Sequence, residues 1–230
     1  MTIRDAIAQY LAFFKARNQA IAGIADATFK EVLYLVEIDT LSRAAFPTIV
    51  GHRKRVVRFI DTCSGWQDKD RVSAVQLKLA LEGEGIRSGQ LYDSVNRRIN
   101  AWGYGLIIRP EDDLTLGEVL PLATPRDRSC VTTARYAELL YMYRNYVVHE
   151  FRTPGQGIDL GDDLPPTPYY IGTDCPGGGQ NSWELVFPGH FLHGVCDGCL
   201  SGLEVHLITN NLNPYDAYDF GPMWRRPPQP

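Results

Sequence analysis

The chain has 230 residues, 44% of them hydrophobic and 22% charged, which is the composition of a globular protein with a sizeable core. Its formal net charge of −4 excludes a general electrostatic attraction to nucleic acid, so any nucleic-acid site must be a local one. Its 5 cysteines are odd in number and scattered, which excludes a disulfide framework.

The sequence also bears on location. The N-terminal stretch MTIRDAIAQYLAFF is interrupted by Arg4, Asp5 and Gln9, so it lacks the continuous apolar region of a signal peptide. No stretch approaches the ~20 uncharged apolar residues that cross a membrane. These features predict a cytoplasmic protein that has no membrane partner.

The first part of the chain shows the apolar spacing of amphipathic helices. One helix is predicted to begin after Thr2, a candidate N-cap with Asp5 three residues later. The same spacing predicts further helices over residues 26–45, 50–63, 70–82 and 88–102. Residues 103–130 lose this period, and we expect a long connection there with one short strand.

The last part of the chain mixes helix and strand patterns. A clear helix is predicted over residues 132–151, and YYIG and SWELVFP are predicted to form a β-hairpin within residues 165–188. A last helix follows over residues 189–210. We therefore expect a mainly α fold, with a helical bundle over 1–151, a loop, β-hairpin and C-terminal helix packed on it over 152–210, and an extended tail over 211–230.

Candidate zinc ligands follow one another in the last predicted helix. His190, His193, Cys196 and Cys199 are spaced three apart, and Cys175 lies upstream. Cys196 and Cys199 also fall on the apolar positions of this helix, where free cysteine is commonly buried. We favour core packing for these two cysteines, and a zinc site of Cys175, Cys196, Cys199 and His193 is the alternative.

The helix over residues 132–151 carries an arginine that packing does not explain. Arg144 lies between Leu140 and Val148, one turn away on either side, on the flank of the buried stripe. Arginine is favoured at such a place when its guanidinium meets an anion or a carboxylate. Asn145 and His149, which are four residues apart, share the adjacent polar face.

Arginine, asparagine and histidine together suit metal-independent cleavage of RNA. A histidine can take the proton from the 2′-hydroxyl or protonate the leaving 5′-oxygen. Arg144 can stabilise the crowded phosphorane, and Asn145 can hold the imidazole or a phosphate oxygen. Positions five apart lie about 140° apart round a helix, so Arg144 and His149 of one chain are expected to point in different directions. Two copies that face each other would bring both kinds of side chain into one cleft.

The stretch RNYVVH, from Arg144 to His149, resembles the R-x4-6-H motif of the HEPN superfamily. The resemblance covers residues 1–151 and implies a HEPN-like helical bundle, with Arg144, Asn145 and His149 as catalytic residues and with no metal or cofactor. It implies a homodimeric endoribonuclease that leaves a 2′,3′-cyclic phosphate and a 5′-hydroxyl on RNA. It further implies a toxin–antitoxin or phage-defence context, with an antitoxin or defence-system protein as a partner.

One departure from the family concerns its control. A toxin branch carries a tyrosine two residues after the histidine, which a partner nucleotidyltransferase modifies, and this chain has Phe151 there. That mode of neutralisation is therefore not expected. The alternative function is a non-catalytic HEPN-like module that binds RNA, a nucleotide or a protein. The presence of arginine, asparagine and histidine together favours the enzyme.

Other charged residues have supporting roles in this interpretation. Glu31, Glu37 and Asp39 of the second predicted helix are candidate partners of Arg144, and the sequence does not choose among them. The basic stretches His52–Arg58 and Asn96–Arg98 are candidate guides for a phosphate backbone. Solvated helix faces are the more frequent explanation of such stretches.

Overall fold

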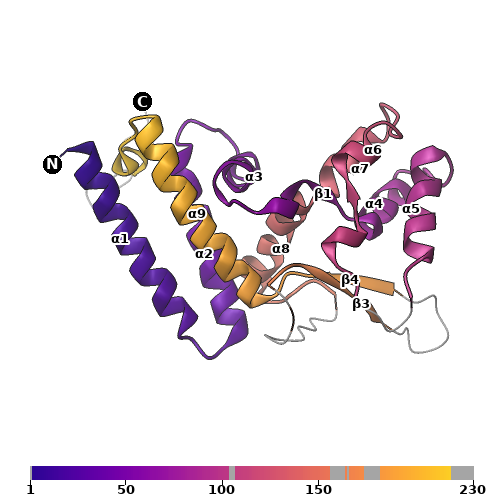
Figure 1. Cartoon of the computed structure of the whole chain (residues 1–230), viewed down its shortest axis with the longest axis horizontal. Coiled ribbons are helices and arrows are strands. Elements are labelled where there is room, and N and C mark those ends of the chain that lie inside the picture. The colour runs from indigo at the N-terminus through magenta and orange to yellow at the C-terminus, as the bar shows by residue number, and fades with distance from the viewer. Residues whose placement is uncertain (1, 104–106, 156–163, 165, 174–181, 219–230) are drawn as a thin grey trace.

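The computed structural model describes residues 2–103, 107–155, 164, 166–173 and 182–218, and this part of the chain is mainly helical (Figure 1). The helices are α1 (Ile3–Ala22), α2 (Ala27–Ala45), α3 (His52–Cys63), α4 (Ala74–Gly83), α5 (Gln90–Asn100), α6 (Leu116–Val119), α7 (Arg128–Thr133), α8 (Tyr136–Glu150) and α9 (Gly189–Thr209). The strands β1 (Arg71–Val72) and β2 (Leu114–Thr115) pair antiparallel, as do β3 (Tyr169–Thr173) and β4 (Ser182–Val186). Within these residues, no helix combines the length and the apolar character needed to cross a membrane.

The larger hydrophobic cluster of the described residues lies among α1, α2, α3, α8 and α9. The long helices α1, α2 and α9 run side by side at one end of the molecule (Figure 1). The predicted start of α1 is confirmed, because the Thr2 hydroxyl accepts from the Asp5 amide at 3.2 Å and the Asp5 carboxylate accepts from the Thr2 amide at 2.8 Å. These two bonds satisfy amides that the first turn of a helix otherwise leaves unpaired.

The helix α9 belongs to the interior of this cluster. Gly198 and Gly202 face the end of α3 so closely that an added Cβ would lie 2.0 Å from the Ser64 carbonyl oxygen and 2.1 Å from that of Cys63. Only glycine allows this approach. Cys196 and Cys199 are fully buried, so the expected core packing of both is confirmed.

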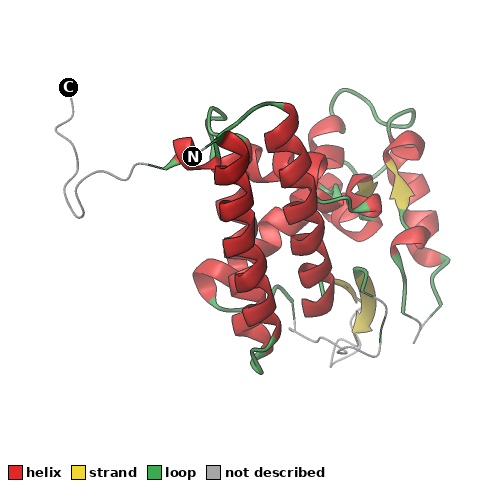
Figure 2. Cartoon of the chain, turned by 60° about the vertical axis from the view of Figure 1, so that its left-hand side comes forward, coloured by secondary structure: helices red, strands yellow, loops and turns green. Residues whose placement is uncertain are grey.

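A smaller cluster lies among α4, α5, α6 and α7 at the other end of the molecule. The hairpin of β3 and β4, which is confirmed, extends from the start of α9 toward this part (Figures 1 and 2). Tyr170 of β3 is fully buried there, and its hydroxyl donates to Asp113 and lies 2.7 Å from the Ser73 hydroxyl, which donates to it. Tyr136 of α8 donates to the same Asp113 carboxylate at 2.7 Å, so these hydroxyls join the hairpin and α8 to the smaller cluster.

Two predicted helices differ in their bounds. The helix expected over residues 132–151 is wrong at its start, because α7 ends at Thr133 and α8 begins at Tyr136. Backbone pairing interrupts it: the Ser73 amide donates to the Ala134 carbonyl at 2.9 Å, and Arg135 bridges to Val72. The helix expected over residues 70–82 is also wrong at its start, since β1 comes first and α4 begins at Ala74.

The ends of two segments differ as well. The apolar spacing predicts Phe151 as the last residue of a helix, but it follows α8 with a left-handed φ of 53° and is exposed. Residues 211–218, expected to be extended, contain the short helix η4 (Pro214–Ala217), and the hydroxyls of Tyr218 and Tyr10 lie 2.7 Å apart. Residues 219–230 of the predicted tail lie outside the described part of the chain.

Candidate active site

Two polar contacts fasten α2 to α8. The Tyr143 hydroxyl donates to the Glu31 carboxylate at 2.7 Å in a buried place. One residue further along α8, the Arg144 guanidinium donates to the Asp39 carboxylate through Nη2. The structure thus chooses Asp39 among the three candidate partners of Arg144, because Glu31 meets the neighbouring tyrosine and Glu37 lines a cavity against α1.

The three predicted site residues lie together in one chain. Nη1 of Arg144 is 3.1 Å from Oδ1 of Asn145 and 2.7 Å from Nε2 of His149. The expectation that Arg144 and His149 point in different directions is therefore wrong. The Cα–Cβ bonds do diverge by about 140°, but the long arginine side chain bends along the helix and its guanidinium reaches the imidazole.

This contact orients the imidazole. Every guanidinium N–H is a donor, so Nε2 of His149 accepts in this contact and Nδ1 carries the ring proton. A lone pair on Nε2 is what a general base requires. Because His149 is exposed in the last turn of α8 while Arg144 is 11% exposed, the imidazole is the part of the pair that faces solvent.

The Asp39 oxygen that accepts from Arg144 also contacts a second histidine, His52. Oδ2 of Asp39 lies 3.3 Å from Nε2 of His52, the first residue of α3, and Nδ1 of His52 lies 3.0 Å from the Tyr141 hydroxyl. Burial raises the pKa of the Asp39 carboxyl, and the charges of Arg144 and His52 act against that rise. The helices α2, α3 and α8 thus meet in one network of hydrogen bonds and ion pairs.

Two buried atoms of this network have no hydrogen-bond partner among the described residues. They are Nε of Arg144 and Oδ1 of Asp39, although the two side chains contact each other through Nη2 and Oδ2. A guanidinium and a carboxylate can form two parallel bonds, and here they form one. The arginine therefore keeps donor capacity that its partner does not use.

The basic stretch His52–Arg58 divides between the site and the surface. His52 belongs to the network, Arg53 pairs with Glu138 at 2.7 Å, and Arg55 contacts the Ser42 hydroxyl at 3.4 Å. Lys54 and Arg58 are exposed and four residues apart on α3, so they share one face of that helix.

The second basic stretch lies elsewhere. Asn96–Arg98 belongs to α5, which packs in the smaller cluster at the other end of the molecule (Figure 1). Arg98 lies 3.6 Å from the Glu118 carboxylate, and Arg97 donates to the Asp93 carbonyl at 3.4 Å. This stretch is not part of the Arg144 network.

The structure does not bring the alternative zinc ligands together among the residues that it describes. Burial raises the pKa of the Cys196 and Cys199 thiols, which favours the neutral thiol over the thiolate that a metal needs. The His193 ring stacks on Tyr34 with 5.5 Å between centroids. Cys175 lies outside the described residues, and among those that are described no three metal-ligating side chains gather.

Sequence reasoning missed part of the network. The basic stretch around His52 predicts a phosphate guide, and no motif in the sequence points to Tyr141. Tyr141 is three residues before Arg144, so the two share a helix face, and this spacing is the signal that could have found it. For His52 no such signal exists, because its place depends on how α3 crosses α8.

Comparisons with family models, with curated proteins and with solved structures give no match to this chain.

Proposed function

We propose that the chain is a metal-independent endoribonuclease of the HEPN type, with Arg144, Asn145 and His149 as its catalytic residues. The observation that carries the proposal is the contact of one guanidinium with both Asn145 and His149, while Asp39 anchors it from α2. A cation beside an imidazole whose Nε2 lone pair faces that cation is the pair of groups that cleavage by a 2′-hydroxyl requires, once substrate takes over the cation.

The reaction follows from these groups. When a phosphodiester enters, Arg144 turns its spare donors to the phosphate oxygens and releases Nε2 of His149. The imidazole then takes the proton from the 2′-hydroxyl, whose oxygen attacks phosphorus, and the bond to the 5′-oxygen breaks. The products are a 2′,3′-cyclic phosphate and a 5′-hydroxyl.

The leaving 5′-oxygen needs a proton. In the homodimer that the HEPN resemblance implies, the partner subunit's His149 would supply it as the protonated imidazolium, once that ring no longer accepts from its own arginine. Both ring nitrogens of His52 are already engaged, by Asp39 and by Tyr141, so His52 is assigned as a positioning residue that orients Asp39. Lys54 and Arg58 on the exposed face of α3 are suited to guide the RNA backbone.

The cellular setting is part of the same proposal. A cytoplasmic toxin–antitoxin or phage-defence role fits a nuclease whose base is held by its own arginine until substrate arrives. An antitoxin or defence-system protein would then control it. Because residue 151 is phenylalanine, modification of a hydroxyl at that position is not that control.

The test is cleavage of labelled RNA in excess EDTA. Wild type should cleave, and Arg144→Ala and His149→Ala should each lower the rate by at least ~100-fold, as loss of a general base or of an electrostatic stabiliser does. His193→Ala, which removes a histidine on α9 that pairs with Asp197 at 3.5 Å, is the matched control and should leave the rate unchanged.

Two outcomes would contradict the proposal. If both site variants cleave as fast as wild type, the activity does not come from this site. If wild type binds RNA and cleaves none of a broad set of sequences, the non-catalytic RNA-binding module is the correct function. His149→Gln provides a second variant at an exposed position, should Arg144→Ala fold poorly.

A further inference from the structure

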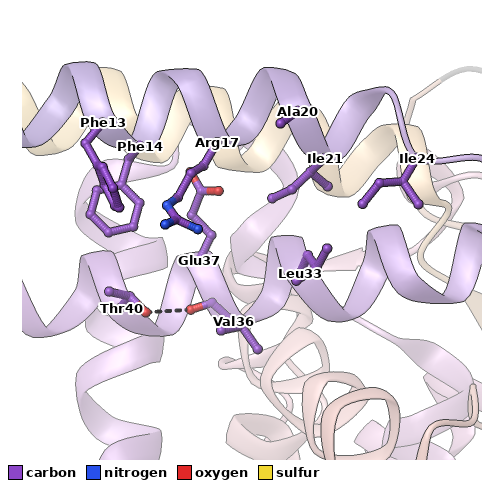
Figure 3. A pocket seen from close by; sticks show the side chains of 10 residues that line it. All are labelled: Phe13, Phe14, Arg17, Ala20, Ile21, Ile24, Leu33, Val36, Glu37 and Thr40. Carbon is purple, nitrogen blue, oxygen red and sulfur yellow. Dashed lines mark hydrogen bonds between the residues drawn. The ribbon is translucent and has the colours of Figure 1, made fainter.

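A cavity of about 610 Å³ lies between α1 and α2, lined by neither Arg144 nor His149. Figure 3 shows Phe13 and Phe14 at one end, Ile21, Ile24 and Leu33 at the other, and Arg17 and Glu37 between them. Its size is that of pockets that hold small molecules, which typically have apolar walls and a few polar groups.

Several of its apolar walls face solvent. Phe13 is 51% exposed, Leu33 38% and Val36 39%, although all three are large hydrophobic side chains. Exposed apolar side chains that gather round one hollow indicate a surface that something covers. The apolar side chains alone would suit any hydrophobic ligand. The charged residues that line the cavity, Arg17 and Glu37, therefore decide which chemical class of ligand it binds.

The floor carries a carboxyl group without a complete set of partners. Glu37 is 5% exposed, and its Oε1 atom is buried and accepts no hydrogen bond from any residue that the structure describes. A buried carboxylate without a donor is costly, so a ligand that brings a donor to it gains that energy. Arg17, the cation that lines the cavity, lies over the Phe13 ring at 4.3 Å from its centroid.

The charges round Glu37 are acidic in balance. Its ionisable neighbours come from each packed element: Arg17 and Tyr10 from α1, Tyr34 from α2, and Asp197, Cys196 and Cys199 from α9. Two carboxyl groups stand against one guanidinium, so an added positive charge is favoured over a negative one.

We propose that this cavity binds a small apolar amine, whose ammonium group donates to the Glu37 carboxylate while its hydrocarbon or aromatic body lies against Phe13, Phe14 and Leu33. The ammonium supplies the missing donor and the missing charge together, and its body covers the exposed apolar walls. The aromatic rings at one end add favourable contact for a cation. The site is independent of the proposed RNA chemistry.

Binding of the amine is coupled to the protonation of Glu37, and the direction of the pH dependence follows from that coupling. Burial, with Asp197 in support, raises the pKa of Glu37 to about 7, while Arg17 opposes that rise. The ammonium form pairs with the ionised carboxylate, so binding releases a proton from Glu37 and strengthens as pH rises. With a pKa of about 7, the ionised fraction grows about tenfold between pH 6 and pH 8, and affinity should grow by the same factor.

Isothermal titration with three ligands of one shape tests this. The probes are 2-phenylethylamine, 2-phenylethanol and phenylacetate, which share a body and differ in the polar group. We expect the amine to bind at least ~10-fold more tightly than the other two at pH 8, and to weaken about tenfold at pH 6. The two isosteres should not show that pH dependence.

Variants locate the binding. Glu37→Gln keeps the shape of the side chain and should abolish both the preference for the amine and its pH dependence. Ala20→Trp, at an exposed position that lines the cavity, should block all three probes without touching the carboxyl. Arg17→Ala should not weaken the amine, because Arg17 competes with it for Glu37. Circular dichroism and thermal unfolding of each variant before titration establish that it is folded.

Each contrary result overturns the proposal. Tightest binding of phenylacetate would mean an anion site on Arg17, and equal binding of the three probes would mean a purely apolar site. No binding of any probe, or amine binding that Glu37→Gln leaves unchanged, would remove the site altogether. A lysine-bearing helical peptide that binds where the free amine does not would make the hollow a protein-docking groove instead.

Discussion

Asp39 and Glu37 are two acidic residues of the helix α2 that differ in their surroundings and in their hydrogen-bond partners. Two residues apart on α2, they point about 200° apart, so one faces α3 and α8 while the other faces α1 and α9. Burial raises the pKa of both carboxyls. Asp39 contacts Arg144 and His52, whereas one carboxylate oxygen of Glu37 has no hydrogen-bond partner in the described part of the chain. A buried carboxylate with partners holds a cation in place, and one without partners is free to take a ligand or a proton.

The largest expected effect comes from removing the charge of Asp39. Asp39→Asn leaves the buried guanidinium of Arg144 without an ionic partner, so the free energy of unfolding at pH 7 should fall by about 3 kcal/mol. RNA cleavage should also fall, because Arg144 loses its anchor. Urea unfolding measures the first effect and initial rates measure the second.

Glu37→Gln is the matched control for that change. It is the same kind of substitution on the same helix, and within the described part of the chain Glu37 forms no salt bridge. Burial of its charge outweighs the attraction of Arg17, so the substitution should not destabilise the protein at pH 7. If the two substitutions lower the free energy of unfolding equally, the stated difference between the partners of Asp39 and Glu37 is wrong.

The pH dependence of the free energy of unfolding tests the raised pKa of Glu37. A carboxyl whose pKa is about 7 in the folded protein and 4.5 in the unfolded chain binds its proton more tightly when folded. Its contribution to stability is therefore complete at low pH and declines as pH rises from about 4.5 to 7. Between pH 5 and pH 8, wild type should lose about 2 kcal/mol more than Glu37→Gln does.

The difference between the two proteins is the quantity to measure, because Asp113, whose pKa burial raises to about 6, titrates in both. Parallel stability curves for wild type and Glu37→Gln would show that Glu37 has an ordinary pKa and would weaken the argument for the amine site as well.

The smallest expected effect concerns His52. As a positioning residue it should act on turnover, so His52→Ala should lower kcat about tenfold, or about 1.4 kcal/mol in activation free energy, with KM nearly unchanged. A phosphate-guiding role would instead raise KM and reduce the dependence of KM on salt. Lys54→Ala, in the same basic stretch, should show that second pattern, and identical behaviour of the two variants would reject the assignment of His52.

Parts of this structure that depend on local spacing could be predicted from the sequence. The helices α2, α3 and α9 and the β3–β4 hairpin appear where the apolar periods and turn residues put them. The break between α7 and α8 could not be predicted, because pairing of Ala134 and Arg135 with distant backbone overrides a continuous helical pattern. Local propensity gives way there to tertiary hydrogen bonds.

The contacts of Arg144 likewise could be predicted only in part from the spacing of residues along the chain. A charged side chain on the buried flank of a helix predicts an anion or a carboxylate as the partner of Arg144, and Asp39 is that partner. The choice of Asp39 depends on how α2 crosses α8, and the contact with His149 depends on the bend of one long side chain. Neither is encoded in the spacing of residues along a helix. For the same reason the angle between Arg144 and His149 no longer argues for a dimer, which now rests on the HEPN resemblance alone.

The central claim is that Arg144 and His149 cut RNA by activating its own 2′-hydroxyl. Mass spectrometry of the ends produced by wild type in EDTA, on an RNA and on the same RNA with 2′-deoxy sugar at the cleaved position, tests it most directly. We expect 2′,3′-cyclic phosphate and 5′-hydroxyl ends from the first substrate and no cleavage of the second. Ends that carry a 3′-hydroxyl and a 5′-phosphate, or cleavage at the 2′-deoxy position, would contradict it.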